Sequence, residues 1–288
     1  MAQRVAVITG TSTGFGFETA KKFAAAGFRV FGTMRDLTGR NAEPKRTLEQ
    51  LGVTVVELDV TSQASVDRAA ATINAATDRV DVLVNNAGTA HMGIVEGFTP
   101  DSLERQYATN VVGPHRLVRA FLPGMRARRS GLVIFVSSVV GRMVLPFTGV
   151  YTSSKWALEA LSESLSYELR PFGVDIAIVE PGAYATNIGN VAVSPDDVAT
   201  LDAYGEVGKT IEKIFAGLVA SAGDPVEVAN AIVSLSEARQ GTRKLRTTVP
   251  GGSPVDAINA ASEPINHSVL EAYGLGAFLP EGAFATHA

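Results

Sequence analysis

The sequence contains no cysteine, which excludes disulfide bonds, thiolate metal ligands and a cysteine nucleophile. Its four histidines (His91, His115, His267 and His287) are scattered without the spacing of a metal site, so we expect no metal. Runs of basic residues are missing and the net charge is −4, so we expect no nucleic-acid partner. No apolar run reaches the roughly 18 residues of a membrane span, and the N-terminus lacks a signal-peptide pattern. A cytoplasmic protein is expected.

Apolar residues are plentiful: 46% of the 288 residues are hydrophobic, which is enough for a sizeable core. Short β-branched runs alternate with longer amphipathic stretches, a pattern typical of β-α-β units and a parallel sheet. Strands are expected at 4–9, 29–34, 54–58, 80–85, 131–136, 174–179 and 245–249, and helices at 16–27, 62–77, 101–128 and 152–171. We predict one α/β domain over residues 1–288, a doubly wound Rossmann fold with a seven-stranded parallel sheet.

Two segments depart from this alternation. Residues 187–224 contain few strand signals and several glycines and prolines, with one amphipathic piece at 211–219. Ligands of open α/β sheets bind beyond the carboxyl ends of the strands, so an insertion here would cover a substrate. A surface loop without a role is the alternative. Residues 250–288 form a weakly patterned C-terminal extension to which the sequence assigns no function.

A glycine-rich turn, TGTSTGFG, directly follows the first expected strand. Glycines between a strand and a helix let the backbone bend sharply and approach a pyrophosphate, which the helix N–H groups attract. The alternative is a glycine-rich turn that binds nothing. The residues that we expect to contact a dinucleotide are Gly10, Ser12, Thr13, Gly14, Phe15 and Gly16.

The end of the second strand decides which dinucleotide fits. An acid there would bind the ribose 2′-hydroxyl of NAD, whereas an arginine would bind the 2′-phosphate of NADP. Both are present, as Arg35 and Asp36. A count of about 20 residues from Gly16 reaches Asp36 and favours NAD. A strand that ends at Met34 places Arg35 at the ribose instead.

Small and polar residues end the third and fourth strands, where a cofactor would lie. Asp59 and Val60 follow the third strand, and Asn86, Ala87 and Gly88 follow the fourth. Asp59 is a candidate acceptor for an adenine amine, or a plain cap for the next helix. We expect all five residues near the cofactor.

Chemically active side chains cluster later in the chain. Tyr151 and Lys155 lie four residues apart on an expected helix, so they share a face. An ammonium beside a phenol favours the phenolate, so we predict a lowered pKa for Tyr151 and a role in acid–base chemistry. Ser138, at the end of the fifth strand, would offer a hydroxyl to a substrate oxygen. Asn110 is a poor helix former inside a helical stretch.

In order and spacing, these motifs resemble those of the short-chain dehydrogenase/reductase family over about residues 4–186. The matching motifs are Thr9–Gly16, Asn85–Gly88, Asn110, Ser138, Tyr151, Lys155 and the run Pro181-Gly182-Ala183-Tyr184-Ala185-Thr186. The segment Val30–Asp36 is similar to that of NADP(H)-preferring members, with Arg35 at their basic position. The resemblance therefore implies NADP(H), with NAD(H) as the less favoured cofactor.

The resemblance also implies roles for individual residues. Tyr151 would be the general acid/base and Ser138 would orient the substrate oxygen. Lys155 would hold the nicotinamide ribose and tune Tyr151, and Asn110 would position a water that links Lys155 to solvent. Cofactor contacts are also implied for Tyr151, Lys155, Pro181, Gly182 and Thr186, with Thr186 bonding the carboxamide.

Some features depart from the family's pattern. Phe15 replaces the usual smaller aliphatic residue between two motif glycines, so the local packing is expected to differ. The C-terminal part lacks the common Val-Asp-Gly-Gly ending, which argues against the usual tetramer and leaves a homodimer as the expected assembly. The extra length and residues 31–36 are more similar to the steroid- and retinol-dehydrogenase-like branch.

The loop between Ser138 and Tyr151 is mostly apolar and must pass the reacting carbon if both side chains reach it. We expect a hydrophobic ketone, aldehyde or alcohol as substrate. The expected substrate contacts are Met92, Val140, Met143, Phe147 and Tyr184. Arg142 is expected to face solvent. The leading hypothesis is NADPH-dependent carbonyl reduction; the alternatives are a non-catalytic NADP(H) sensor or scaffold, and a cofactor-recycling epimerase or dehydratase.

Overall fold

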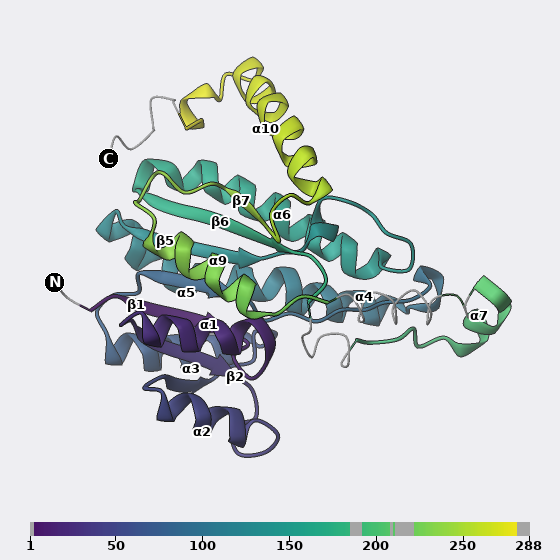
Figure 1. Ribbon diagram of the computed structural model, residues 1–288, viewed down its shortest axis with the longest axis horizontal. Coiled ribbons are helices and arrows are strands. Elements are labelled where there is room, and N and C mark those ends of the chain that lie inside the picture. The colour runs from purple at the N-terminus through teal and green to yellow at the C-terminus, as the bar shows by residue number, and fades with distance from the viewer. Residues whose placement is uncertain (1–2, 185–191, 208–209, 211–221, 281–288) are drawn as a thin grey trace.

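The computed structural model describes residues 3–184, 192–207, 210 and 222–280. Its sheet confirms the predicted fold: seven parallel strands in the order β3-β2-β1-β4-β5-β6-β7 (Figure 1). The strands are β1 (Val5–Thr9), β2 (Arg29–Met34), β3 (Thr54–Glu57), β4 (Val82–Asn85), β5 (Gly131–Val136), β6 (Val174–Pro181) and β7 (Arg246–Val249). Only strand ends differ from the prediction.

The helices match the expected amphipathic stretches and add others. The α-helices are α1 (Gly14–Ala25), α2 (Ala42–Gln50), α3 (Gln63–Ala76), α4 (Pro100–Tyr107), α5 (Gly113–Arg128), α6 (Gly149–Leu169), α7 (Val198–Ala203), α9 (Val226–Glu237) and α10 (Pro254–Ala272). Sequence periodicity missed α2, α7, α9 and α10. The reason is clear for α2 and α10, because each buries a single residue fully, Leu48 and Val255 respectively.

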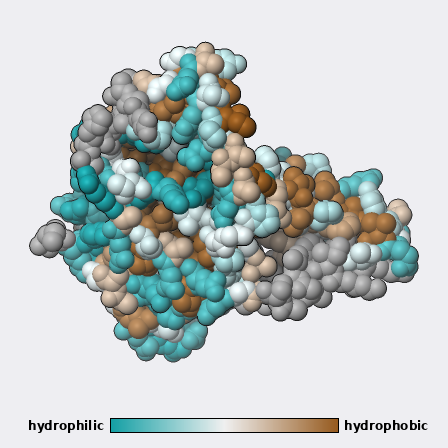
Figure 2. Space-filling view, turned by 45° about the horizontal axis from the view of Figure 1, so that its top comes forward, coloured by the Kyte–Doolittle hydropathy of each residue, from teal (hydrophilic) through white to brown (hydrophobic). Residues whose placement is uncertain are grey.

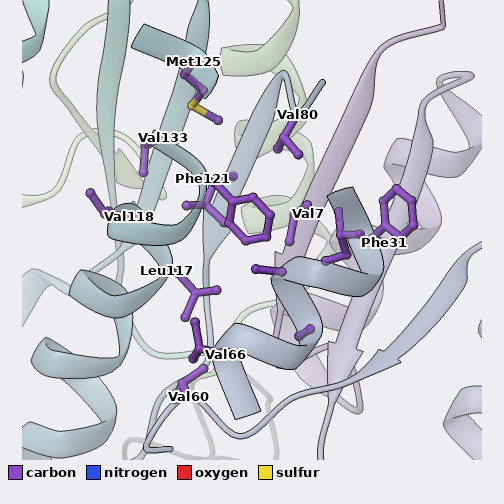
Figure 3. Close-up of a cluster of buried hydrophobic side chains, with 14 of the residues drawn as sticks. Val7, Phe31, Val60, Val66, Val80, Leu117, Val118, Phe121, Met125 and Val133 are labelled. Carbon is purple, nitrogen blue, oxygen red and sulfur yellow. The ribbon is translucent and has the colours of Figure 1, made fainter. Parts of the chain in front are cut away.

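Helices cover both faces of the sheet, each over its own apolar cluster. Alternate strand residues enter opposite clusters, as Val7 and Ile8 of β1 do. One face packs against α3, α5 and α6; Figure 3 shows Phe121 and Met125 of α5 meeting Val7 and Val133 of the sheet. The other face packs against α1, α2 and α9. This two-sided burial explains the nearly continuous apolar character of the strands.

The strand order reverses beside β1, which pairs with β2 on one side and β4 on the other. The glycine turn at the end of β1 and the segment 86–88 at the end of β4 therefore meet at the switch point. Doubly wound sheets bind their ligands there. The topology thus brings together the two segments that we expected to hold a cofactor.

The insertion between β6 and α9 is described only in part. Its described section runs alongside α4 and carries α7 (Figure 1), and apolar side chains lie on the surface of this protruding part (Figure 2). Val198 is one of its exposed apolar residues. Two isolated β-bridges tie the insertion to the rest of the chain: Val193 pairs with His91, and Tyr184 pairs with Gly223. Nearly half of the predicted cover at 187–224, including the amphipathic piece at 211–219, lies outside the described residues. Among the described helices, none has the length and apolarity to cross a membrane.

Candidate active site

Tyr151 is buried in the first turns of α6, at the edge of a small apolar cluster. Its ring packs with Ala90 and Val140, and the half-buried Met92 and Leu145 lie against the same cluster. Of the predicted substrate contacts, Met92 and Val140 are thus placed beside Tyr151. Met143 and Phe147 lie in the same loop, half-buried and outside this cluster.

The predicted lowering of the Tyr151 pKa is wrong in this structure. Burial raises the pKa of Tyr151 to about 12, and a hydrogen bond with Ser138 acts weakly in the opposite direction. The Nζ of Lys155 lies over the Tyr151 ring, 5.6 Å from its centroid, and donates its hydrogen bond to Val136 instead. The phenol therefore keeps its proton at neutral pH, which suits a proton donor.

Lys155 is buried one turn after Tyr151 in α6, and its ammonium forms a hydrogen bond with the sheet. Its Nζ donates to the carbonyl oxygen of Val136 at 2.8 Å, at the end of β5. Burial lowers the pKa of Lys155 to about 8, while the charge of Glu159 raises it. The carboxylate of Glu159 thus helps to keep the ammonium charged near neutral pH.

Ser138 joins the two elements that frame the site. Its Oγ donates to the carbonyl oxygen of Pro181 at 3.4 Å and accepts from the backbone N–H of Val140 at the same distance. Both contacts are long, so the hydroxyl is weakly held where β5 leads into the loop toward Tyr151. Pro181 and Gly182 lie on the other side of this hydroxyl, at the end of β6.

The structure explains why Asn110, a poor helix former, stands inside a helical stretch. The predicted helix 101–128 is divided by a π-helical turn, Ala108–Val112, with Asn110 buried in it. Its side chain accepts from the Thr89 N–H at 2.9 Å and donates to the Thr89 oxygen and to Ser154 Oγ. π-Helical turns are frequent at functional sites. Here the turn lets Asn110 fix the chain that follows β4 against α6.

The glycine turn has the close approaches that its sequence suggested. A Cβ on Gly16 would lie 2.2 Å from the oxygen of Gly10 and 2.4 Å from Asn86 Nδ2, so no larger residue fits. Gly10 and Gly14 have positive φ angles of 70° and 57°. Asn86 Nδ2 donates to the oxygens of Thr9 and Gly10, so it fastens the turn to β4. This tight turn places the N-terminus of α1 at the switch point, where its N–H groups would fit a pyrophosphate.

Arg35 and Asp36, the two candidates at the end of β2, differ in their partners. Asp36 adopts a φ of 52° and its carboxylate accepts from the N–H groups of Gly39 and Arg40 at 3.0 and 3.1 Å. Its charge is therefore used within its own turn. The exposed Arg35 side chain makes no hydrogen bond or ion pair to the described residues, and it faces Asp59 closely enough to lower the pKa of that group.

Asp59 and Val60 have local partners. Thr61 donates to the Asp59 carboxylate through its N–H and its hydroxyl, at 2.9 and 2.7 Å. Burial raises the pKa of Asp59, but these hydrogen bonds and the nearby arginine charges outweigh it and leave the pKa below its usual value. Ser62, not Asp59, caps α3. Val60 is buried, and its carbonyl accepts from Arg116 at 3.1 Å.

Three predicted placements need comment. Tyr184 is not beside Tyr151: its hydroxyl donates to Glu227 at 2.9 Å and its ring packs edge-on against Phe15, so it belongs to the opposite apolar cluster. Thr186 lies outside the described residues. Arg142 does not face solvent, because its guanidinium bonds side chains of α10.

Sequence analysis missed a buried charged cluster behind the site. In this carboxylate cluster, Arg246 of β7 bonds Glu159 and Glu163 of α6 at 2.9 and 2.6 Å, and Glu180 lies 3.7 Å from the same guanidinium. Glu159 and Glu180 are 2% and 0% exposed. Burial and the charge of Glu159 raise the pKa of Glu180 to about 7, while Asn259 donates to it at 2.7 Å and partly opposes this. The signal available in the sequence was Glu180, an acidic residue that follows the apolar run of β6 and that indicates a buried charge.

The raised pKa of Glu180 makes the stability of the protein depend on pH. The pKa of Glu180 is about 7 in the folded protein and near 4.5 in the unfolded chain, so the folded state binds the proton of the Glu180 carboxyl more tightly. This contribution to stability is present at pH 4 and is lost as the pH rises through 7. We expect thermal unfolding to show a fall in Tm between pH 5 and pH 8 that is smaller in Glu180→Gln. The exposed Glu104→Gln is the control, and equal pH profiles for wild type and Glu180→Gln would contradict the expectation.

Comparison with known proteins identifies the family of this chain. The family model described as short chain dehydrogenase matches residues 4–196. Human 17-beta-hydroxysteroid dehydrogenase type 1 is 42% identical over 206 residues, which cover 69% of this chain and 62% of that protein.

Solved structures extend the likeness to nearly the whole chain. A short-chain dehydrogenase from Streptomyces avermitilis is 34% identical with a TM-score of 0.78, and the match covers 96% of this chain and 98% of the other. An alcohol dehydrogenase from Thermococcus sibiricus, complexed with 5-hydroxy-NADP, is 26% identical with a TM-score of 0.70 and covers 86% and 96%.

Proposed function

The chain belongs to the short-chain dehydrogenase family of oxidoreductases, and from that premise we propose that it interconverts a hydrophobic ketone or aldehyde with its alcohol, using NADP(H). The observation that carries the proposal is the placement of Tyr151. A buried, protonated phenol lies in an apolar cluster with the Ser138 hydroxyl beside it and the Lys155 ammonium one turn away.

The described residues fit a dinucleotide. Gly10 and Gly16 let the end of β1, the segment after β4 and the start of α1 pack closely, because a Cβ on either would clash with its neighbours. The N-terminus of α1, held in this way at the switch point, would bind a pyrophosphate. Arg35 is exposed with no partner among the described residues, whereas Asp36 is held in its turn. These two facts favour a 2′-phosphate, and hence NADP(H), over a free 2′-hydroxyl. The complex of the Thermococcus alcohol dehydrogenase with a NADP derivative supports the same choice.

The side chains of this chain divide the acid–base work. When bound, the nicotinamide supplies the hydride that reduces a carbonyl carbon. In that step Tyr151 donates its phenolic proton to the carbonyl oxygen, and the Ser138 hydroxyl hydrogen-bonds the same oxygen as negative charge develops. Lys155, charged beside the ring, stabilises the phenolate that remains. Asn110 holds the 89–90 segment that packs on Tyr151.

An apolar substrate is favoured by the surroundings of Tyr151. Ala90, Met92, Val140 and Leu145 offer no charge to a substrate, and Arg142 is occupied by α10. Removing apolar surface from water would drive a hydrophobic carbonyl compound into this site.

Purified protein with NADPH and a panel of aryl, steroid and aliphatic carbonyls tests the proposal. We expect loss of NADPH absorbance in proportion to the alcohol formed, and weaker turnover with NADH. Tight NADPH binding without turnover on any carbonyl would favour a sensor, and product formed without net NADPH loss would favour an epimerase or dehydratase.

A further inference from the structure

Helix α10 docks on the molecule with a polar face. In this helix, all of which the structure describes, Val255 alone is fully buried, whereas Ile265 is 61% exposed. Its half-buried side carries Asn259, Ser262 and Asn266, at the spacing of one helix face. Ile258, Ile265 and Val269 of α10 are exposed, so hydrophobic burial beyond Val255 and the half-buried Leu270 does little to fix the position of this helix. Its inward hydrogen bonds must do so.

Two of these bonds hold Arg142. The Nε of Arg142 donates to Asn259 Oδ1 at 2.8 Å, and a terminal nitrogen of the same guanidinium donates to Ser262 Oγ at 2.6 Å. Arg142 ends the short helical turn Val139–Gly141 that follows Ser138. Hydrogen bonds from the C-terminal extension to Arg142 therefore hold the loop that leads from Ser138 to Tyr151. We call residues 139–147 the substrate loop.

Asn259 also bonds the sheet. Its Nδ2 donates to Glu180 Oε2 at 2.7 Å, one residue before Pro181, whose carbonyl accepts from Ser138. One amide thus connects the end of β6 to Arg142. Glu180 is fully buried, so the free energy of leaving its oxygen unpaired opposes any movement of Asn259.

The held loop forms one wall of the site. Val139, Val140 and Leu145 lie on both sides of Arg142 in the sequence, and all three pack in the cluster that contains Tyr151. The opposite face of the loop also has little freedom, because a Cβ on Gly141 would lie 3.0 Å from Glu159 Cγ. The position of Arg142 therefore determines the positions of Val139, Val140 and Leu145 beside Tyr151.

We propose that Asn259 is a positioning residue for the substrate loop, which places the C-terminal helix in the machinery of substrate recognition. Asn259 holds the loop through its hydrogen bond with Arg142, and its hydrogen bond to Glu180 fixes the orientation of the Asn259 side-chain amide. The idea rests on the proposed function only in that the loop then contacts a carbonyl substrate. Substrate affinity should respond to Asn259, whereas NADPH affinity should not, because no bond of Asn259 reaches the glycine turn.

The matched pair Asn259→Ala and Asn266→Ala tests this. Both remove an inward amide of α10 that donates to a glutamate of the carboxylate cluster, but Asn266 bonds the half-buried Glu163 and has no bond to the substrate loop. We expect Asn259→Ala to raise the KM for the carbonyl about tenfold, the scale of a hydrogen bond to a charged group, with kcat and the Kd of NADPH within about twofold. Asn266→Ala should leave all three within about twofold.

Amide hydrogen exchange of residues 139–147 gives a readout independent of turnover. Exchange should quicken in Asn259→Ala and stay at the wild-type rate in Asn266→Ala. Arg142→Leu should raise KM as much as Asn259→Ala, and the double variant no further. If Asn259→Ala does not fold, Ser262→Ala removes one bond to Arg142, leaves Glu180 paired, and should still quicken exchange. Equal exchange in the matched pair, or additive effects of Asn259→Ala and Arg142→Leu, would overturn the proposal. If no carbonyl is reduced, exchange still decides whether the loop is held.

Discussion

Replacing Tyr151 with phenylalanine is expected to lower kcat/KM for carbonyl reduction by about 10²- to 10⁴-fold, the usual contribution of a general acid. The change removes only the hydroxyl, and the ring continues to pack with Ala90 and Val140. NADPH affinity and Tm should therefore stay near the wild-type values. Steady-state kinetics and a thermal melt of the same preparation measure both quantities.

The matched control for this substitution lies on the same helix. Tyr167→Phe also removes one hydroxyl from α6, but that hydroxyl bonds Glu163 at 2.8 Å, away from Ser138. We expect less than about a fivefold change in kcat/KM. A Tyr151→Phe variant as active as Tyr167→Phe would show that another group supplies the proton.

Replacing Arg35 with alanine is expected to weaken NADPH binding by about ten- to thirtyfold and to change NADH binding by less than about threefold. NADPH alone carries the 2′-phosphate, and a charge-assisted hydrogen bond to it contributes about 1.5–3 kcal/mol. The lower part of this range applies to a side chain as exposed as Arg35. Titration calorimetry with each dinucleotide measures the two dissociation constants.

Arg40→Ala is the control for charge alone. Arg40 is exposed in the same turn, and its Nε lies 3.9 Å from Asp36 rather than at the end of β2. It should reduce NADPH affinity by no more than about twofold. If Arg35→Ala weakened NADPH and NADH equally, the ribose would lie in the other register, against Asp36.

Residues close in sequence allowed much of the site to be predicted. The glycine turn, the strand ends and the pair Tyr151 and Lys155 are defined by local spacing, so pattern reading placed them on the correct elements. The charge state of Tyr151 was not predictable in this way. Its pKa depends on burial by Ala90 and Val140, which come from other parts of the chain, and burial outweighed the nearby lysine.

The sequence alone determined the seven-stranded parallel sheet, the glycine turn and the order of the reactive residues, because alternating patterns and short spacings are written along the chain. Only the tertiary structure decided that Asp36 is used within its own turn, that Tyr184 faces α9, and that α10 holds Arg142. The bonds from α10 to Arg142 and Glu163 join residues more than 100 positions apart, and no periodicity in the sequence indicates such a partner. The partners of these side chains, and hence their roles, depend on where the fold places them rather than on residue type.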